Sequence, residues 1–330
     1  MKVVITGGTG FIGLNICRSL LKKNTLSGPS GAQEEIDSIV LFDAVVPNER
    51  PDGLDERVNI VSGDISDCDT VFDLIDRDDV SVFHLASVVS GGGEKDFDLA
   101  MRVNLDGGRH VFEAARARAG TPRVVFASSL AIFGGSAMPD VVSDTTKPVP
   151  QTTYGMTKVI GELMINDYTR KGYIDGRAAR LPTIFIRPGK PNTAASSFCS
   201  GLFREPLQGQ PCALPVERST RMPLLGYRDC IKGFIALHEI DGDRLGDDRA
   251  LNLPNLDCSV ADMVAAAERV AKAHGIDLGP ISDSPDAEIQ AIVSTWATRM
   301  NSDRALALGL PLEDSLDQVV ENFIDDFLEP

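Results

Sequence analysis

A glycine-rich stretch directly after a short apolar run constrains the fold of this chain more than any other feature. The letters TGGTGFIG (6–13) follow Lys2–Thr6 (KVVIT), which predicts a β-strand, and lead into a helical pattern over Phe11–Lys23. The three glycines with the spacing G-x-x-G-x-x-G are Gly7, Gly10 and Gly13. Glycine permits a tight turn and a close approach of a pyrophosphate, and the helix N-terminus offers free N–H groups to phosphates. The stretch therefore predicts a dinucleotide site.

The first half of the chain alternates β-branched runs with helical patterns. Further strands are expected at Ser38–Asp43, Val58–Ser62, Val80–Ala86, Arg123–Ser128 and within Arg177–Ile186. Helices are expected near Asp69–Asp76, Asp96–Ala119 and Thr153–Lys171. Continuous apolar strands that alternate with helices are typical of a parallel sheet covered on both faces. The pattern predicts an α/β fold with a doubly wound parallel sheet.

After Pro188 the alternation fades, and isolated helices follow. One helix should begin after Ser259, with Asp262 completing a cap, and a last one should cover Ser315–Leu328. We expect an N-terminal dinucleotide-binding domain at 1–188 that carries the catalytic residues. A smaller α/β substrate domain at 189–330 should interleave with the sheet edge. Thr25–Glu35 is rich in Gly and Ser and is expected to be a surface loop.

Composition excludes several classes of function. The net charge of −16 argues against nucleic acid as a partner, and it requires a local cation wherever an anionic substrate binds. No apolar run reaches the ~18 residues of a membrane span, and no leader pattern opens the chain, so we expect a cytoplasmic protein. The six cysteines and four histidines show no metal-ligand spacing, so no metal is expected.

Asp43 closes the second expected strand, where a carboxylate accepts hydrogen bonds from ribose hydroxyls and repels a 2′-phosphate. NAD is therefore favoured over NADP, although Asp43 could instead be a turn residue. The separation from the glycines exceeds the usual ~20 residues, and the insert before Asp43 accounts for the excess. Further cofactor contacts are expected at Phe11, Ile12, Asp64, Ile65, Leu85, Ala86, Ser87, Ser128, Leu181 and Thr183.

Tyr154 and Lys158 stand four residues apart and share one face of the expected helix. An ammonium beside a phenol stabilises the phenolate and should lower the pKa of Tyr154 from ~10. Ser129 lies at the end of the fifth strand and could hydrogen-bond the reacting oxygen. The alternatives are a surface helix pair for Tyr154 and Lys158 and a capping role for Ser129. Their order along the chain favours a catalytic set.

Together, TGGTGFIG, VSGDISD, FHLAS, RVNLDGG, FASSLAIFGG and YGMTK resemble the extended short-chain dehydrogenase/reductase family, which includes NAD-dependent epimerases and dehydratases. The resemblance implies a Rossmann fold, bound NAD, Tyr154 as proton acceptor, Lys158 as its partner and Ser129 as the third catalytic group. It also suggests Asn104 as a cofactor-side support of the active-site helix, and a homodimer through the long helices. Leu130 and Ala131 replace the acidic pair of dehydratases, which argues against dehydration.

A narrower resemblance concerns the substrate. EKDFDLAMRVNLDGG and NDYTRKGYIDGRAARLPTIFIRPGKPNTAASSF are similar to a branch of the family that oxidises the 2-hydroxyl of a four-carbon sugar acid such as D-erythronate. The residues expected to bind the acid are Ser87, Ser129, Arg187, Lys190, Asn192 and Arg221. Alternatively, Arg187 forms a structural ion pair and Lys190 is solvated. The single tryptophan, Trp296, is expected to serve packing.

These features predict an NAD-dependent oxidoreductase that acts on a CH–OH group of a small sugar acid. One rival is a nucleotide-sugar epimerase, which would use the same residues but retain its NAD. A rival of another class is an NAD-binding sensor without chemistry. Net accumulation of NADH with a free sugar acid would exclude both rivals.

Overall fold

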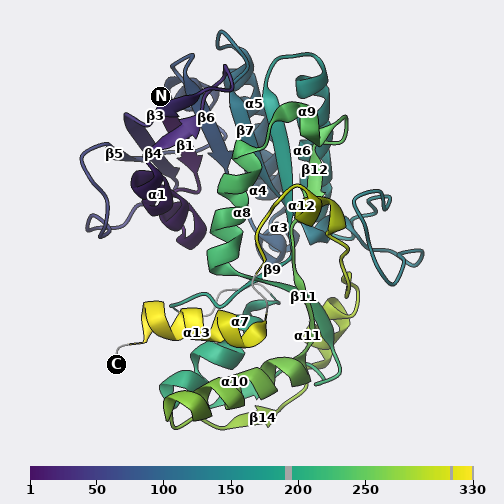
Figure 1. Cartoon of the computed structure of the whole chain (residues 1–330). Helices are drawn as coiled ribbons and strands as arrows, with labels where there is room; N and C mark the ends of the chain where they lie inside the picture. Colours follow the sequence, from purple (N-terminus) through teal and green to yellow (C-terminus); the bar gives the residue numbers. More distant parts are fainter. Residues whose placement is uncertain (190–194, 313–314, 329–330) are drawn as a thin grey trace.

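A seven-stranded parallel sheet organises the molecule in the computed structural model, which describes residues 1–189, 195–312 and 315–328 (Figure 1). In spatial order its strands are β12 (Ala250–Asn252), β8 (Asp175–Leu181), β7 (Arg123–Ser129), β6 (Val80–His84), β1 (Lys2–Thr6), β4 (Ser38–Asp43) and β5 (Val58–Ser62). The strand order reverses between β1 and β6, and such a switch point opens a crevice at the carboxyl ends of the strands. The expected α/β class is confirmed.

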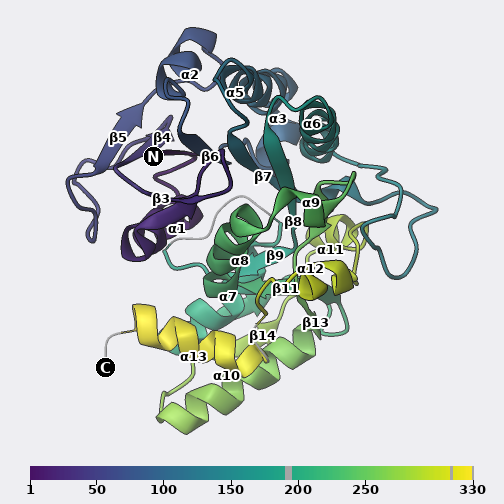
Figure 2. The same ribbon diagram turned by 45° about the horizontal axis from the view of Figure 1, so that its top comes forward.

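Helices cover both faces of this sheet (Figure 2). Helices α1 (Phe11–Lys23) and α8 (Tyr227–Glu239) pack on one face. The helices on the other face are α2 (Cys68–Leu74), α5 (Gly107–Arg116) and α6 (Thr153–Arg170). Along β1, Val3 and Ile5 join the first cluster and Val4 joins the second, as the two-residue period of a strand requires. Both faces are apolar because both are covered.

The chain after β8 builds a second, smaller layer below the sheet in Figure 1. Its small sheets are β13 (Leu256–Ser259) with β11 (Arg221–Gly226) and β9 (Thr183–Phe185), and β10 (Cys212–Leu214) with β14 (Ile281–Asp283). Its helices are α7 (Ser197–Arg204), α10 (Val260–His274), α11 (Ala287–Val293) and α13 (Leu316–Phe327). The chain returns to the main sheet with α8 and β12, so the two parts interleave in sequence.

Several element boundaries match the sequence expectation. Ser259 caps α10 through a reciprocal pair with Asp262, as the motif predicted. The single helix expected over Asp96–Ala119 is instead three pieces: α4 (Phe97–Ala100), a π-helical turn η1 (Met101–Asp106) and α5. The shorter elements are α3 (Ser90–Lys95), η2 (Leu130–Ile132), η3 (Pro206–Gln208), α9 (Gly242–Leu245) and α12 (Asp303–Ala307). Within the described ranges, no helix combines the length and apolarity needed to cross a membrane.

The surface loop expected at Thr25–Glu35 is wrong. The segment forms an antiparallel hairpin of β2 (Thr25–Ser27) and β3 (Gln33–Glu35). Leu26 is fully buried in the cluster beneath α1 and α8. The Ser27 amide and the Gln33 side chain donate to Glu239 at the end of α8, at 2.9 and 2.6 Å. This partner lies more than two hundred residues away in the sequence, so local composition did not reveal it.

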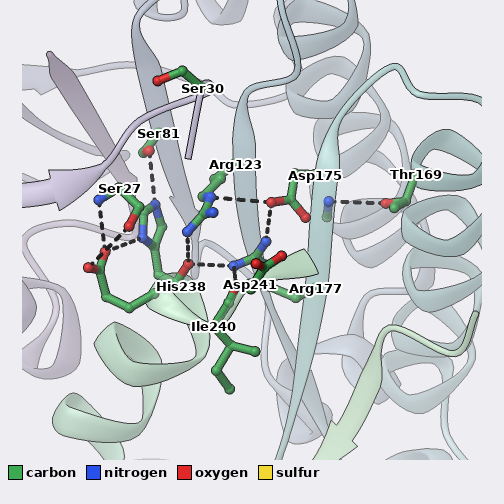
Figure 3. A network of polar contacts seen from close by, with 12 residues as sticks. Ser27, Ser30, Ser81, Arg123, Thr169, Asp175, Arg177, His238, Ile240 and Asp241 are labelled. Carbon is green, nitrogen blue, oxygen red and sulfur yellow. Dashed lines mark hydrogen bonds and ion pairs between the residues drawn. The ribbon is translucent and has the colours of Figure 1, made fainter. Parts of the chain in front are cut away.

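The amino end of the sheet holds a buried polar network (Figure 3). Arg123 and Arg177, from neighbouring strands β7 and β8, both pair with Asp175. The Arg123 guanidinium donates to the carbonyl of His238 at 2.8 Å, and Arg177 donates to the carbonyl of Leu237 at 3.0 Å. These carbonyls end α8, where cations are favourable. The network fixes α8 to the amino end of the sheet. The crevice lies at the opposite end, where the strands have their carboxyl termini.

Candidate active site

A cavity of about 440 Å³ lies at the carboxyl ends of the main sheet strands. One end of its wall is Gly7, Gly10, Phe11, Ile12, Gly13, Leu85, Leu181, Pro182, Thr183 and Ile184. The other end is Val89, Ser90, Ser129, Leu130, Ala131, Thr152, Tyr154, Arg187, Ser196 and Trp296. The first group lies at the ends of β1, β6 and β8 and continues into β9, and the second carries hydroxyls, a phenol, a cation and an indole. The cavity therefore joins a wall that is suited to a dinucleotide cofactor to a chamber that carries polar groups.

The glycines let the backbone come close around the first end of the cavity. Gly7 has φ +68, and a Cβ there would lie 2.9 Å from the Ala86 nitrogen. A Cβ at Gly13 would lie 2.5 Å from the Gly7 carbonyl oxygen. Side chains at these positions would force β1, the strand end at Ala86 and α1 apart. The loop thus has the shape that a pyrophosphate needs at the start of α1.

Asp43 ends β4 beside this loop. Its carboxylate accepts hydrogen bonds from the Thr9 amide at 3.2 Å and from the Val45 amide at 3.4 Å. The two bonds place the carboxylate at the lip of the glycine loop. This position suits an acid that binds a ribose. The same two hydrogen bonds also fit the alternative, in which Asp43 is a turn residue.

Tyr154 and Ser129 meet across the chamber, from α6 and the end of β7. Burial raises the pKa of the Tyr154 phenol, and a hydrogen bond from Ser129 works in the opposite direction. The Ser129 oxygen accepts the Ala131 amide at 3.1 Å, so its own proton remains available to the phenol oxygen. Ser129 is therefore both a cap of η2 and a partner of the phenol. The capping role considered from the sequence is seen, and the catalytic role stays a prediction.

Lys158 lies one turn further along α6 and is 3% exposed. Its ammonium lies 5.2 Å from the Tyr154 ring centre and 4.9 Å from the Phe126 ring centre. Burial lowers the pKa of Lys158 to about 7. The expectation that Lys158 lowers the pKa of Tyr154 in the protein alone is wrong. The ammonium lies over ring faces, and the burial of the phenol outweighs the other influences on it.

Asn104 ties the active-site helix to the loop after β6. Its carbonyl oxygen accepts the Val88 amide at 2.7 Å, and its amide donates to the Val88 carbonyl at 3.0 Å. It also donates to the hydroxyl of Thr157 on α6 at 3.3 Å. Asn104 sits in the π-helical turn η1, a feature that often marks functional sites. It supports the wall of the cavity without lining it.

Arg187 lines the chamber just beyond β9 and is partly buried. Burial and the neighbouring Arg204 lower the pKa of its guanidinium. Among the described residues no carboxylate pairs with it. Arg204, its neighbour, pairs with Glu205 and donates to the Arg187 carbonyl at 3.0 Å. The ion pair considered from the sequence is therefore not seen within the described chain.

Several predicted site residues have other partners. The Ser128 hydroxyl is buried and donates to Glu162, which pairs with Arg180. Arg221 pairs with Asp257 and does not line the cavity. We therefore leave the Ser128 side chain and Arg221 out of the proposed site. Ser128 lies near the end of β7 at the expected edge of the sheet, whereas Arg221 begins β11 in a separate small sheet.

The cavity wall does not include four other predicted contacts, which are Asp64, Ile65, Ala86 and Ser87. Ala86 donates its amide to the Thr6 hydroxyl at 3.2 Å, and the Ser87 hydroxyl donates to the Val88 carbonyl at 3.3 Å. Asp64 accepts from the Ser66 amide at 2.9 Å. Ile65 is buried against Gly107. Lys190 and Asn192 lie outside the described residues.

Sequence reasoning missed part of the chamber. The wall residues without a prior expectation as contacts are Val89, Ser90, Leu130, Ala131, Thr152, Pro182, Ile184, Ser196 and Trp296. The packing role expected for Trp296 was incomplete, because its side chain also faces the cavity. No motif marks it, and only its status as the single tryptophan could have drawn attention. Within residues 1–189, 195–312 and 315–328, no cluster of three potential metal ligands occurs.

Comparison with known proteins supplies independent information. A family model described as the NAD dependent epimerase/dehydratase family matches residues 3–249. A protein named D-erythronate dehydrogenase from Cupriavidus necator is 46% identical, covering 99% of this chain and 98% of the relative. One of the same name from Haemophilus influenzae is 38% identical, covering 98% of this chain and 99% of the relative. A crystal structure described as a nucleoside-diphosphate-sugar epimerase from Agrobacterium tumefaciens superposes with a TM-score of 0.90, at 36% identity over 99% of this chain and 94% of that one.

Proposed function

This chain belongs to the NAD dependent epimerase/dehydratase family, and we propose that it oxidises the C2 hydroxyl of D-erythronate or a closely related sugar acid. Both full-length relatives described above carry the name D-erythronate dehydrogenase. The proposed product is the corresponding 2-oxo acid, and the hydride goes to NAD.

The observation that carries the proposal is Arg187. It offers a guanidinium without a described acidic partner in the chamber that also holds Tyr154 and Ser129. A partly buried cation of this kind is stabilised by a carboxylate ligand, which a guanidinium binds through two parallel hydrogen bonds. A protein with a net charge of −16 repels anions in general, so a local cation is needed to hold an acid.

The first end of the cavity fits the cofactor of the family. Gly7, Gly10 and Gly13 leave room for a pyrophosphate at the start of α1, and Asp43 would hold the adenosine ribose. When bound, the nicotinamide accepts a hydride from the carbinol carbon. Leu85, Leu181 and Thr183 in the cavity wall would hold the nicotinamide end of the cofactor next to Tyr154.

Within the chamber each proposed residue has one task. Tyr154, as phenolate, accepts the proton of the C2 hydroxyl, and Ser129 donates a hydrogen bond that orients the reacting oxygen. Lys158 supplies positive charge beneath the phenol ring. Arg187 holds the carboxylate one carbon away from the reacting centre, so binding also sets the orientation of the hydroxyl.

An epimerase of nucleotide sugars is the second candidate, because a described epimerase superposes closely on this chain. The cavity of about 440 Å³ must take the nicotinamide end of the cofactor together with the substrate. An epimerase returns the hydride to its substrate and produces no net NADH.

The test uses the purified enzyme, NAD and two compounds with the same carbon chain, D-erythronate and the neutral polyol erythritol. We expect NADH to accumulate with D-erythronate and hardly at all with erythritol. Arg187→Gln should raise KM for D-erythronate about 100-fold, since a charge-assisted bidentate contact is lost. Affinity for NAD should stay unchanged.

Arg187→Lys serves as the matched variant, because it keeps the positive charge and loses the two parallel N–H donors of the guanidinium. It should lie between wild type and Arg187→Gln in KM. If wild type forms no NADH with any aldonate, or if erythritol and D-erythronate react equally well, the proposal fails.

We further propose a homodimer through α5 and α6, the long helices on one outer face of the sheet (Figure 2). On α6, Leu163 is 62% exposed. The proposed contact would cover this exposed apolar side chain.

A further inference from the structure

The only tryptophan of the chain lies in the wall of the chamber. Trp296 lines the same cavity as Ser129, Tyr154 and Arg187, although more than a hundred residues separate it from each of them. A large rigid side chain in a substrate chamber occupies space that a ligand cannot use. Its position therefore bears on which ligands fit.

The indole is held in place from two sides. Trp296 packs against the core of the C-terminal part, which includes Val293. It also packs against a small cluster beside the catalytic strand, made of Leu130, Ile132, Phe133, Val142, Ala297 and Met300. It thus bridges the part of the molecule that carries α10 and the part that carries Ser129.

Backbone hydrogen bonds fix the segment that carries it. The Val142 amide donates to the Arg299 carbonyl at 3.1 Å, and the Asn301 amide donates to the Val142 carbonyl at 2.8 Å. Val142 belongs to the connection between η2, which Ser129 caps, and α6, which carries Tyr154. The position of the indole is therefore coupled to the catalytic residues and does not follow a free surface loop.

Beside the apolar Val89, Leu130 and Ala131, the chamber wall carries several polar side chains. The hydroxyl-bearing residues are Ser90, Ser129, Thr152, Tyr154 and Ser196, and Arg187 adds the cation. Hydroxyls and a guanidinium match a polyhydroxy acid at its carboxylate and its carbinol groups. The indole differs from these residues in size and in its flat apolar face. Well-packed interiors do not give way to an extra carbon unit without cost.

We propose that Trp296 is a specificity-determining residue whose indole limits the carbon-chain length of the acid. The inference rests on the proposed function, because it concerns the substrate class of the same chamber. With the carboxylate on Arg187 and the C2 hydroxyl between Ser129 and Tyr154, the remaining carbons extend toward the remaining wall. The indole there accommodates a four-carbon acid and excludes longer ones.

The test compares two acids of matching configuration at C2 and C3. D-erythronate has four carbons, and D-ribonate carries one more hydroxymethylene unit. In Trp296→Ala we expect the ratio of kcat/KM for D-ribonate over D-erythronate to rise about tenfold or more, the usual effect of one carbon unit in a pocket. Trp296→Phe keeps an aromatic wall and should change the ratio by less than about threefold.

Control variants distinguish an effect on the accepted chain length of the acid from damage to the fold. Trp296→Leu keeps apolar packing between the two clusters and should raise the ratio in the same direction as Trp296→Ala. Ile292→Ala alters an exposed residue of the same segment, on α11, and should leave the ratio unchanged. Thermal unfolding and NAD binding of each variant confirm that it is folded.

Fluorescence adds a readout that does not depend on turnover. All tryptophan emission of wild type comes from Trp296, because no other tryptophan exists. Titration of D-erythronate into the enzyme with NADH, which permits no oxidation, should change this emission with saturation. Absence of any change would show that the acid does not reach the indole, and it would overturn the inference.

The outcomes distinguish this inference from the proposed function. If wild type does not oxidise D-erythronate or any other aldonate, both fall. If wild type oxidises D-erythronate but Trp296→Ala and Trp296→Leu keep the wild-type ratio, only the inference on Trp296 falls. It falls as well if both variants are folded and bind NAD but lose turnover with every acid.

Discussion

Tyr154 and Lys158 lie one turn apart on α6, and burial drives both groups toward their neutral forms. It raises the pKa of the phenol above its ordinary value and lowers that of the ammonium to about 7. The fully protonated pair cannot accept a proton from a substrate. Loss of one proton from the pair, which begins near pH 7, produces the form that can serve as base.

We therefore expect kcat/KM for D-erythronate oxidation to rise with pH up to an apparent pKa near 7 and to level off above it. In Lys158→Met only the phenol remains, and its pKa is raised from 10.0, so the rise should move beyond about pH 10. Steady-state rates between pH 5 and 11 measure this shift. Tyr154→Phe should fold, bind NAD and lose turnover by orders of magnitude. A Lys158→Met profile that matches wild type would contradict the assignment.

At the scale of elements, the hairpin β2–β3 is attached to α8 through one carboxylate. Glu239 accepts from the Ser27 amide, the Gln33 side chain and His238. Burial opposes its ionisation, but these hydrogen bonds outweigh burial and hold the pKa of Glu239 well below its usual range. Such a group stabilises the fold above its unfolded pKa, and the contribution fades as pH falls below about 4.3.

Glu239→Gln should lower the free energy of unfolding by about 1–3 kcal/mol at pH 7, the cost of broken bonds to a charged group. The difference from wild type should shrink below about pH 4.3. Urea denaturation at several pH values measures both effects. Glu268→Gln, on the exposed side of α10, should stay within about 0.5 kcal/mol of wild type. Turnover should be unchanged, because Glu239 lies at the amino end of the sheet. Equal loss of stability in both variants would refute this account.

At the scale of the whole molecule, the proposed dimer predicts a solution mass of twice the single chain. Leu163→Glu places a charge at the centre of the proposed contact and should shift the mass toward one chain at micromolar concentration. Leu306→Glu changes an equally apolar residue, 44% exposed on α12, and should leave the mass unchanged. Light scattering coupled to gel filtration measures both. A wild-type mass of one chain would contradict the dimer.

Local features of the chain predicted most of the fold. The first three strands of the main sheet and helix α1 occupy the expected residues, because continuous β-branched runs and the helical period report local geometry. The sequence did not predict the hairpin at Thr25–Glu35, because its stability comes from Leu26 in the core and from Glu239. The sequence also did not predict the interruption of the helix before α5, because residue periodicity does not mark a π-helical turn.

By itself, the sequence determined the glycine loop, the strand-end position of Ser129 and the one-turn spacing of Tyr154 and Lys158. These follow from backbone periods and from the conformational freedom of glycine, which act over a few residues. Tertiary structure alone decided that Arg187 has no described carboxylate partner, that burial moves the pKa of Lys158 to about 7, and that Trp296 faces the chamber. Burial, charge pairing and cavity shape arise between residues far apart in the chain, so they exist only once the chain has folded.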